Sequence, residues 1–579
     1  MQYLSKAILY LVSLIRAGIR KLFLAVRGYN VLRLHLHGPL PDRTRAPGLM
    51  AAFSGRRFGP ALLDVLIALD RARRDERIEV VTVEIESLAC GMSRAEEIRR
   101  ALARVREAGK RVIAVLEEPG MGEYLAALGA SEIVLAPAGS LNVSGLASEV
   151  MFLKGLLDKA GVEAQLAARG KYKSAREMFT EDEMSAANRE MTEALVGDLY
   201  EQLIAEIARH RKMEPEAARA ALDRGPFLAS EAVELSLVDR TGYLDDIDEA
   251  LEKELPKVLP LKLQPYLRVS VPDERAATAR PTPIAIVEVS GHIKSGRSTP
   301  GSDGTMRATG SRSFIHELEK AAAHPSVEAV LLRIDSPGGS GLASDLMWHA
   351  LGKVAKDKPV VISMSNVAAS GGYYVAAIAP GCPILATAST ITGSIGVLGG
   401  KFALGELYEK LGIKKEIISR GARATYHSDY RLYSDDELQK LRGDIDAFYV
   451  DFVSKMAQAR ARSFDDIDAV AQGRVWTGKQ ALEIGLVDEL GGMIDAFDLL
   501  RKKLQLPEWA PLALIEAPGR KRRWPLRLEW NFEESPLSKS KYGAIGGALE
   551  SALFRPAQLA ALFARDRVLA LLPFEINFR

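Results

Sequence analysis

Cysteine is almost absent from this chain, since only Cys90 and Cys382 occur among 579 residues. Two cysteines exclude a disulfide scaffold and a cysteine-rich zinc site. An excess of charge of one sign is also missing, because 77 Lys and Arg residues face 75 Asp and Glu residues and leave a net charge of +2. This balance gives no electrostatic reason to expect a nucleic-acid partner. No Walker-type phosphate-binding loop occurs either, so nothing predicts a nucleotide.

Long uncharged apolar runs are missing from the amino terminus, where basic side chains interrupt the apolar residues 1–27. The longest uncharged stretch after Lys6 is Ala7–Ile15, and a bilayer span needs about 20 residues. Polar residues recur every seven positions and predict a polar stripe on one helix face; they are Lys6, Ser13, Arg20 and Arg27. We therefore predict that residues 1–28 form an amphipathic helix in the membrane interface. The alternatives are a tilted or partial transmembrane helix, or a helix that docks on the protein itself.

The two halves of the chain repeat each other at an offset of 249–251 residues. Four pairs of segments match in the same order: 78–87 with 327–336, 123–147 with 373–397, 156–170 with 407–421, and 236–243 with 485–492. A repeated order at one spacing indicates a duplicated domain. Each copy alternates β-branched runs with helical patterns, which predicts an α/β fold of parallel strands and crossover helices.

These patterns divide the chain into five parts. We expect the first repeat at 29–265 and the second at 284–505, joined by a linker at 266–283 that is rich in proline and charge. The amino-terminal helix precedes the first repeat. Residues 506–579 form a carboxy-terminal extension to which the repeat does not extend.

The two copies differ where chemistry is expected. The second copy has two glycine-rich elements, Asp335–Gly341 after a strand and Ala369–Gly372 at a helix start, and the first copy has lost both. Paired glycines let backbone N–H groups approach a ligand, and a serine at a helix start lies in the positive field of the helix. Together they predict a nucleophile, Ser370, with donors for an oxyanion, as acyl transfer requires. Alone, Ser370 would be read as a helix cap.

A nucleophilic serine needs a base, and none of the eight histidines lies in a recognisable Ser-His-Asp pattern. Four segments of the second repeat suggest a base other than histidine, because they resemble the signature segments of the signal peptide peptidase A family. They are Asp335–Gly341, Ala369–Tyr374, Thr392–Val397 and Gly473–Asp488. The resemblance covers roughly residues 30–505, and the tandem arrangement is similar to the long form of that family. It implies two Clp/crotonase-like domains, a ββα superhelix in each, and a Ser/Lys serine protease.

The resemblance also implies roles for individual residues. The general base is a lysine in a Tyr-Lys-Ser-Ala segment of the first repeat, which here is Lys173; Lys171 is its nearest competitor. Ser394 orients the lysine amine. The oxyanion hole uses the N–H of Gly371 and one N–H from Gly338 or Gly339. No cofactor and no metal are expected. Because a lysine of ordinary pKa is protonated at neutral pH, Lys173 should be buried where the repeats meet.

The resemblance further implies a bacterial inner-membrane protein whose catalytic domains face the periplasm or cell exterior. Its substrates would be remnant signal peptides and other apolar peptides. Its partners would be the lipid surface and further copies of itself, with which it would form a tetramer. Two other functions stay open at this point. One is a crotonase-type acyl-CoA hydratase or hydrolase, since that fold also uses paired amides for an oxyanion. The other is a non-catalytic membrane scaffold.

Overall fold

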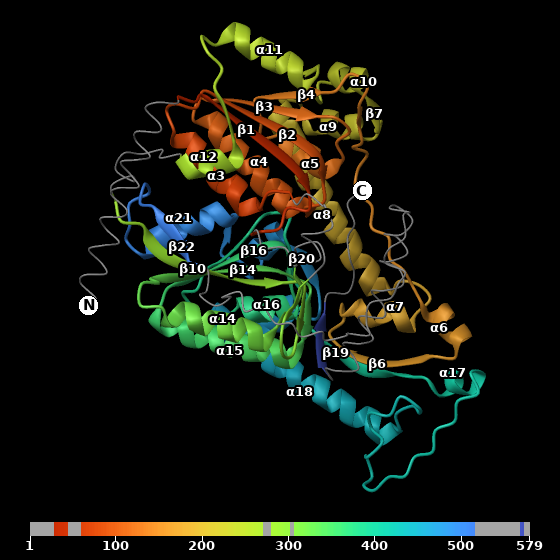
Figure 1. The fold of residues 1–579 in the computed structure, drawn as a ribbon. Helices are drawn as coiled ribbons and strands as arrows, with labels where there is room; N and C mark the ends of the chain where they lie inside the picture. The colour runs from red at the N-terminus through yellow and green to blue at the C-terminus, as the bar shows by residue number, and fades with distance from the viewer. Residues whose placement is uncertain (1–27, 44–58, 270–278, 301–305, 516–567, 572–579) are drawn as a thin grey trace.

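The computed structural model describes residues 28–43, 59–269, 279–300, 306–515 and 568–571 (Figure 1). The predicted membrane helix at 1–28 therefore lies outside the described residues, apart from Gly28. Among the described helices, none combines the length and the apolar character that a bilayer span requires.

The first repeat is built on a parallel sheet of six strands in the order β8-β4-β3-β2-β1-β9. The strands are β1 (Val31–Gly38), β2 (Val80–Leu88), β3 (Arg111–Leu116), β4 (Glu132–Leu135), β8 (Arg240–Thr241) and β9 (Pro260–Lys262). Crossover helices α3 (Leu62–Arg74), α4 (Gly91–Glu107) and α5 (Met121–Ala127) connect them. This is the parallel arrangement that the alternating sequence pattern predicts.

The second repeat uses the same strand order in an eight-stranded sheet. The order β22-β10-β14-β16-β17-β21 in this sheet corresponds to the order β9-β1-β2-β3-β4-β8 in the first sheet. Two strands are added: β18 pairs with β16, and β20 pairs with β18. Their bounds are β10 (Thr282–Ser290), β14 (Ala329–Ser336), β16 (Val360–Ala369), β17 (Ile384–Ala386), β18 (Ile391–Gly393), β20 (Val475–Thr477), β21 (Glu489–Leu490) and β22 (Leu512–Ile515). Helices α14 (Ser311–Ala323), α15 (Gly341–Asp357) and α16 (Gly371–Ala376) lie between the strands in sequence.

The helices confirm the duplication. Long helices α8 (Ala186–Arg211) and α18 (Asp435–Arg460) have 26 residues each and start 249 residues apart. Each is capped by a serine, Ser185 or Ser434, whose side chain accepts a hydrogen bond from a backbone N–H of the first turn. Three shorter pairs keep the same spacing: α9 (Pro215–Leu222) with α19 (Phe464–Val470), α10 (Ala229–Glu234) with α20 (Gly478–Glu483), and α11 (Leu244–Glu254) with α21 (Met493–Lys503).

A third sheet joins the two repeats. Its order is β12-β13-β11-β15-β23-β19-β6, where β6 comes from the first repeat. The strands are β6 (Glu163–Arg169), β11 (His292–Lys294), β12 (Thr299–Pro300), β13 (Met306–Gly310), β15 (Gly338–Ser340), β19 (Val397–Ala403) and β23 (Val568–Leu571). Strands β6 and β19 pair antiparallel over seven residues, from Val397 opposite Arg169 to Ala403 opposite Glu163. This long pairing fixes the first repeat against the second beside the candidate site.

Short elements complete the described fold. They are β5 (Ser140–Leu141) paired with β7 (Phe227–Leu228), α6 (Lys154–Ala160), the 3₁₀ turn η1 (Ser174–Arg176), α7 (Glu177–Thr180), α12 (Leu263–Val269) and α17 (Gly405–Lys410). Helix α12 crosses the predicted boundary at 266: its Tyr266 is buried and donates a hydrogen bond to Asp75. Strand β22 also pairs with β10, so part of the predicted extension adds to the second sheet.

The surface between the repeats holds a buried cluster of charges. Strand β14 alternates, so that Val330 and Leu332 face the second repeat's own core while Ala329 and Leu331 join the core of the first. Arg333 continues the second row and therefore points at the first repeat. Its guanidinium donates to Asp42 at 3.0 Å and to Glu97 at 2.5 Å.

Arg94 from helix α4 extends this charge cluster towards the candidate site. It donates to Asp42 at 3.1 Å and to Asp335 at 2.7 Å. Burial raises the pKa of the Asp42 carboxyl, but the guanidiniums of Arg333 and Arg94 outweigh burial and leave that pKa below its usual value. Through Arg94, the first repeat thus binds Asp335, the first residue of the glycine-rich element Asp335–Gly341.

Candidate functional site

Ser370 lies at a sharp turn between strand β16 and helix α16. Its backbone has φ 55° and ψ −114°, a conformation that is strained for a residue with a side chain, and its N–H donates to the carbonyl of Gly393 at 2.8 Å. The neighbouring glycines are needed for space. A Cβ on Gly371 would lie 2.6 Å from Ser344 Oγ, and one on Gly372 would lie 2.7 Å from the Ser336 carbonyl oxygen. The strand–turn–helix therefore presents the Ser370 hydroxyl at a fixed position.

Lys173 comes to this site from the first repeat. It follows strand β6 by four residues, and the chain turns there against the second repeat, because the N–H of Tyr172 donates to the carbonyl of Gln472 at 2.8 Å. The Lys173 side chain is 2% exposed, whereas that of Lys171 is 62% exposed and lies beside Glu190. The structure separates these two candidates by burial and brings only Lys173 of the two to Ser370.

The three predicted side chains meet at one point. Lys173 Nζ lies 2.8 Å from Ser370 Oγ, 3.0 Å from Ser394 Oγ and 3.1 Å from the Ser394 carbonyl oxygen. Ser370 and Ser394 are fully buried. Desolvation by burial lowers the pKa of the Lys173 amine well below its ordinary value, and among the described residues no carboxylate opposes this shift. This is the environment that a neutral, proton-accepting lysine requires.

The two predicted oxyanion elements also lie together. A Cβ built on Gly371 would be 3.2 Å from both Gly338 Cα and Gly339 N, so the glycine-rich strand β15 passes directly beside the residue after Ser370. Gly338 N–H donates to Ser336 Oγ at 3.2 Å, and this serine donates to the Gly291 carbonyl at 2.7 Å. The N–H of Gly338 is thus already partnered by the Ser336 side chain.

Gly473 of the second repeat sets the position of Lys173. It has φ +76°, and a Cβ there would lie 2.6 Å from the backbone nitrogen of Lys173. The resemblance implies a peptide substrate and the role of base for Lys173, so we expect Gly473→Ala to displace Lys173 and lower kcat by about 100-fold. Misplacement of a catalytic group by about 1 Å costs this much. The matched control is Gly412→Ala, where φ is +71° and no atom lies within 4 Å. Equal activity of the two variants would contradict the positioning role.

The sequence alone did not identify the charges that hold the repeats together. Arg333 stands in an otherwise apolar β-branched run, and this was the one available signal, because a charge in a buried strand needs a partner. Its partners Asp42 and Glu97 lie 291 and 236 residues away in sequence. Nothing local marks them.

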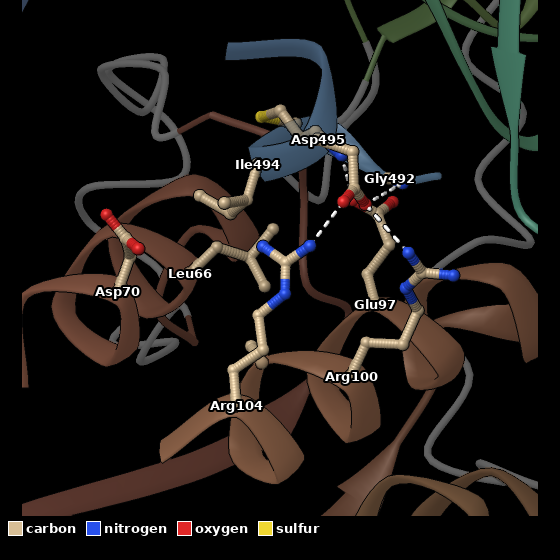
Figure 2. Close-up of a pocket in the computed structure, with 10 residues that line it drawn as sticks. Leu66, Asp70, Glu97, Arg100, Arg104, Gly492, Ile494 and Asp495 are labelled. Atoms are coloured by element: carbon tan, nitrogen blue, oxygen red, sulfur yellow. Dashed lines mark hydrogen bonds and ion pairs between the residues drawn. The ribbon is translucent and has the colours of Figure 1, made fainter. Parts of the chain in front are cut away.

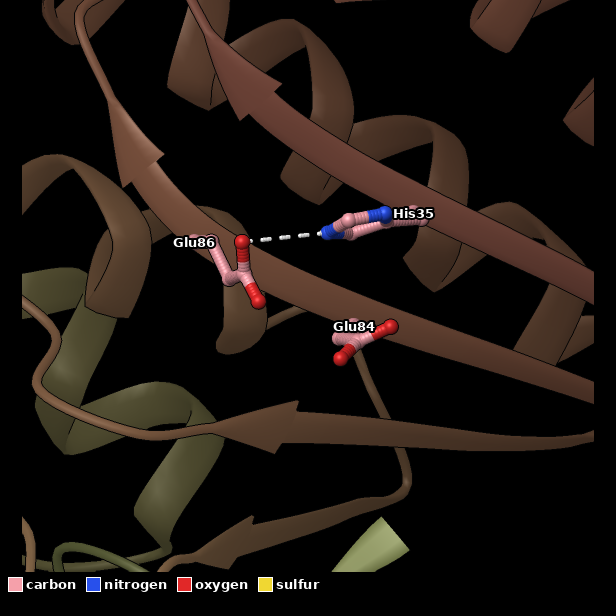
Figure 3. Close-up of side chains that lie close together, drawn as sticks. All are labelled: His35, Glu84 and Glu86. Carbon is pink, nitrogen blue, oxygen red and sulfur yellow. Dashed lines mark ion pairs between the residues drawn. The ribbon is translucent and has the colours of Figure 1, made fainter.

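Two further features lie apart from these residues. Figure 2 shows a pocket between α3, α4 and α21, where Arg100 and Arg104 both bind Asp495 and no predicted site residue lines the wall. Figure 3 shows His35, Glu84 and Glu86 on strands β1 and β2, with His35 Nε2 3.2 Å from a Glu86 carboxylate oxygen. Among the described residues this is the one group whose donor atoms lie close enough to share a metal ion. It contains none of the residues around Ser370.

Comparison with known proteins agrees with this architecture. The model of peptidase family S49 matches twice, at residues 104–258 and 353–507, again 249 residues apart. The Arabidopsis thaliana protein named serine protease SPPA, chloroplastic, is 33% identical over 503 residues, which cover 85% of this chain and 72% of that protein. Protease 4 of Salmonella typhi is 31% identical over 500 residues, covering 83% of this chain and 79% of that protein.

A solved ClpP1 chain from Listeria monocytogenes matches 36% of this chain and 93% of its own length, at 14% identity and a TM-score of 0.23. That likeness is too distant to assign a fold, so the Clp/crotonase architecture stays a prediction. The two family matches cover more than half of the chain, and the two curated relatives are matched over most of their length. The chain belongs to peptidase family S49 and carries two copies of the family's domain in tandem.

Proposed function

We propose that Ser370 and Lys173 form the catalytic dyad of this serine protease. Ser370 Oγ attacks the carbonyl carbon of a peptide bond while Lys173 Nζ accepts the hydroxyl proton. The tetrahedral intermediate then collapses, the C–N bond breaks, and the lysine returns the proton to the leaving amine. Water attacks the resulting ester by the same route, with Lys173 again accepting and returning a proton, and the second product leaves as a carboxylic acid. No external redox partner or cofactor is required for this balance.

One observation carries the proposal: a fully buried serine hydroxyl lies 2.8 Å from a lysine amine whose pKa is lowered by burial. A protonated lysine could not accept the proton, and an exposed one would stay protonated at neutral pH. The hydroxyl and carbonyl oxygens of Ser394 accept hydrogen bonds from the same amine, so we assign Ser394 the role of orienting Lys173. The nucleophile and base come from different repeats, which makes the tandem arrangement part of the mechanism.

We assign the oxyanion hole to the N–H groups of Gly371 and Gly339. Both lie on elements that turn beside Ser370, and Gly338 is the weaker candidate because its N–H already donates to Ser336. Helix α16 begins at Gly371, so its first N–H groups have no partner within the helix. Donors fixed in this way need no reorganisation as the charge develops on the oxygen.

The wider role follows from the resemblance and from the amino-terminal segment. We propose that the substrates are cleaved signal peptides and other apolar peptides. We also propose that residues 1–28 attach the protein to the bacterial inner membrane, with the catalytic domains on the periplasmic or outer side, and that copies assemble as a tetramer. We further propose the Clp/crotonase-like ββα superhelix for each repeat.

The test is active-site labelling combined with product analysis. A serine-reactive fluorophosphonate should label the purified protein, and Ser370→Ala should abolish both labelling and cleavage of an apolar peptide. Turnover of an acyl-CoA thioester without peptide cleavage would favour the crotonase-type alternative. A protein that neither reacts with the probe nor cleaves peptides would favour the scaffold.

The Ser394 hydroxyl offers a finer test of the dyad. In Ser394→Ala the lysine loses one oxygen at 3.0 Å, and we expect kcat to fall about 10-fold with KM little changed, equivalent to about 1.4 kcal/mol. The lost oxygen is an acceptor for the ammonium form, so the lower pH limb of kcat should also move towards lower pH. A drop in activity without that movement would mean that Ser394 supports the fold rather than the base.

A further inference from the structure

The last described strand, β23, lies between two strands that border the proposed dyad. It pairs antiparallel with β15, where Gly338, Gly339 and Ser340 lie opposite Leu571, Ala570 and Leu569. On its other edge it pairs antiparallel with β19, where Leu398 and Gly399 lie opposite Leu569 and Val568. Strand β15 carries Gly339, one of the two proposed oxyanion donors, and β19 begins three residues after Ser394. Residues 568–571 also contact α16, the helix that starts after Ser370.

This position is the one that an extended peptide would take. Strand β23 separates β15 from β19, so without it each would present an unpaired edge to the slot between them. A peptide entering such a slot gains main-chain hydrogen bonds along both edges, and alternate side chains give specificity. The segment Val568–Leu571 carries no charge and consists of apolar residues, which matches the substrate class proposed above.

The described side chain of the segment fills an apolar pocket built by both repeats. Leu569 is fully buried and packs on Leu398 of β19. The remaining wall consists of half-buried apolar side chains from β6, from the segment after Lys173 and from β19: Leu166, Ala168, Ala175 and Phe402. Burial of a leucine side chain in such a pocket is favourable, because its apolar surface is removed from water. The pocket therefore favours a peptide with an apolar residue at this register.

We propose that β23 is an internal pseudosubstrate: residues 568–571 of this chain occupy the peptide-binding slot and compete with peptides supplied from outside. This inference rests on the proposed function, because it takes the slot beside Ser370 as the substrate site. A segment tethered to its own site acts at an effective concentration in the millimolar range. An external peptide must displace it, so its apparent affinity is reduced by the fraction of time that the slot is filled.

The test replaces the anchoring leucine in the full-length protein. In a Ser370→Ala background, which prevents turnover, Leu569→Asp should bind a fluorescent peptide of residues 565–574 about fivefold or more tightly than the background protein does. The same peptide carrying Leu569→Asp should not bind, because a carboxylate would be buried in the apolar pocket. With Ser370 restored, Leu569→Asp should lower KM for an apolar peptide to a similar extent. Leu569→Ala is the milder variant and should act in the same direction.

Leu411→Asp is the matched control, since Leu411 is exposed and lies at the end of α17. It should bind the peptide no better than the background protein. Equal peptide affinity in the Leu569 variants and the background would overturn the pseudosubstrate. Peptide binding that responds to Leu569 without any cleavage in the active protein would instead overturn the proposed function and leave the slot assignment standing.

Discussion

Lys173→Met is expected to lower kcat/KM for peptide cleavage by about 10⁴-fold. Methionine keeps the length and apolar stem of lysine but has no amine to accept the Ser370 proton, and general-base catalysis contributes about 10²–10⁴-fold. Ser370→Ala should be at least as severe, because the covalent route is lost. The double variant should be hardly worse than Ser370→Ala alone, since the two groups act as one unit. The measurement is single-turnover cleavage of a fluorogenic apolar peptide.

The pH profile provides the independent readout for the same variant. Burial lowers the pKa of the Lys173 amine, and in the proposed dyad the neutral form is the active one. Activity should therefore rise as pH increases through that lowered pKa, and the rise should be complete below the ordinary lysine value. Lys173→Met should abolish this limb in whatever activity remains. Lys171→Met is the control. Because the Lys171 amine is exposed, this substitution should leave both the rate and the pH limb unchanged. A limb that persists in Lys173→Met would assign the base to another group.

Arg333→Met is expected to lower the free energy of unfolding by about 3–5 kcal/mol. The side chain is 1% exposed and its guanidinium lies between the buried carboxylates of Asp42 and Glu97. Its removal would leave Glu97 without its arginine partner and leave Asp42 with Arg94 alone, which also binds Asp335. Breaking a buried pair from one side costs this much. The measurement is urea denaturation at pH 7, followed by circular dichroism.

A second variant separates charge from packing. Adding Glu97→Gln to Arg333→Met removes one of the stranded charges and should recover part of the lost free energy. Arg423→Met, which breaks an exposed pair with Asp436, should leave the urea midpoint unchanged. An Arg333→Met protein as stable as the wild type would mean that this buried charge cluster does not stabilise the fold.

Much of the candidate site could be predicted from the sequence because the second repeat can be compared with the first. The second repeat keeps glycine-rich elements that the first has lost, and this contrast singles out Ser370. The resemblance to a known family pointed to Lys173, and the second repeat has no lysine in the matching stretch 416–439. The alternation of strands and helices was likewise predictable, since periodicity follows from which faces are buried.

Other features depend on pairings between residues far apart in sequence. The Gly338 N–H donates to Ser336 Oγ, and Ser336 in turn donates to the Gly291 carbonyl, 45 residues earlier in the sequence. Strand β23 lies in a part of the chain that shows no repeat and no motif, so its place between β15 and β19 could not be inferred from its own residues.

The amino-acid sequence by itself determined the duplication and the α/β class and singled out Ser370 as the candidate nucleophile, because these are carried by local patterns and by their repetition. The tertiary structure decided that a lysine from one repeat meets that serine, that the amine is dehydrated there, and that Arg333 finds Asp42 and Glu97. The reason is physical: desolvation and ion pairing depend on which surfaces come together, and that is set by long-range packing of two sheets rather than by any short segment.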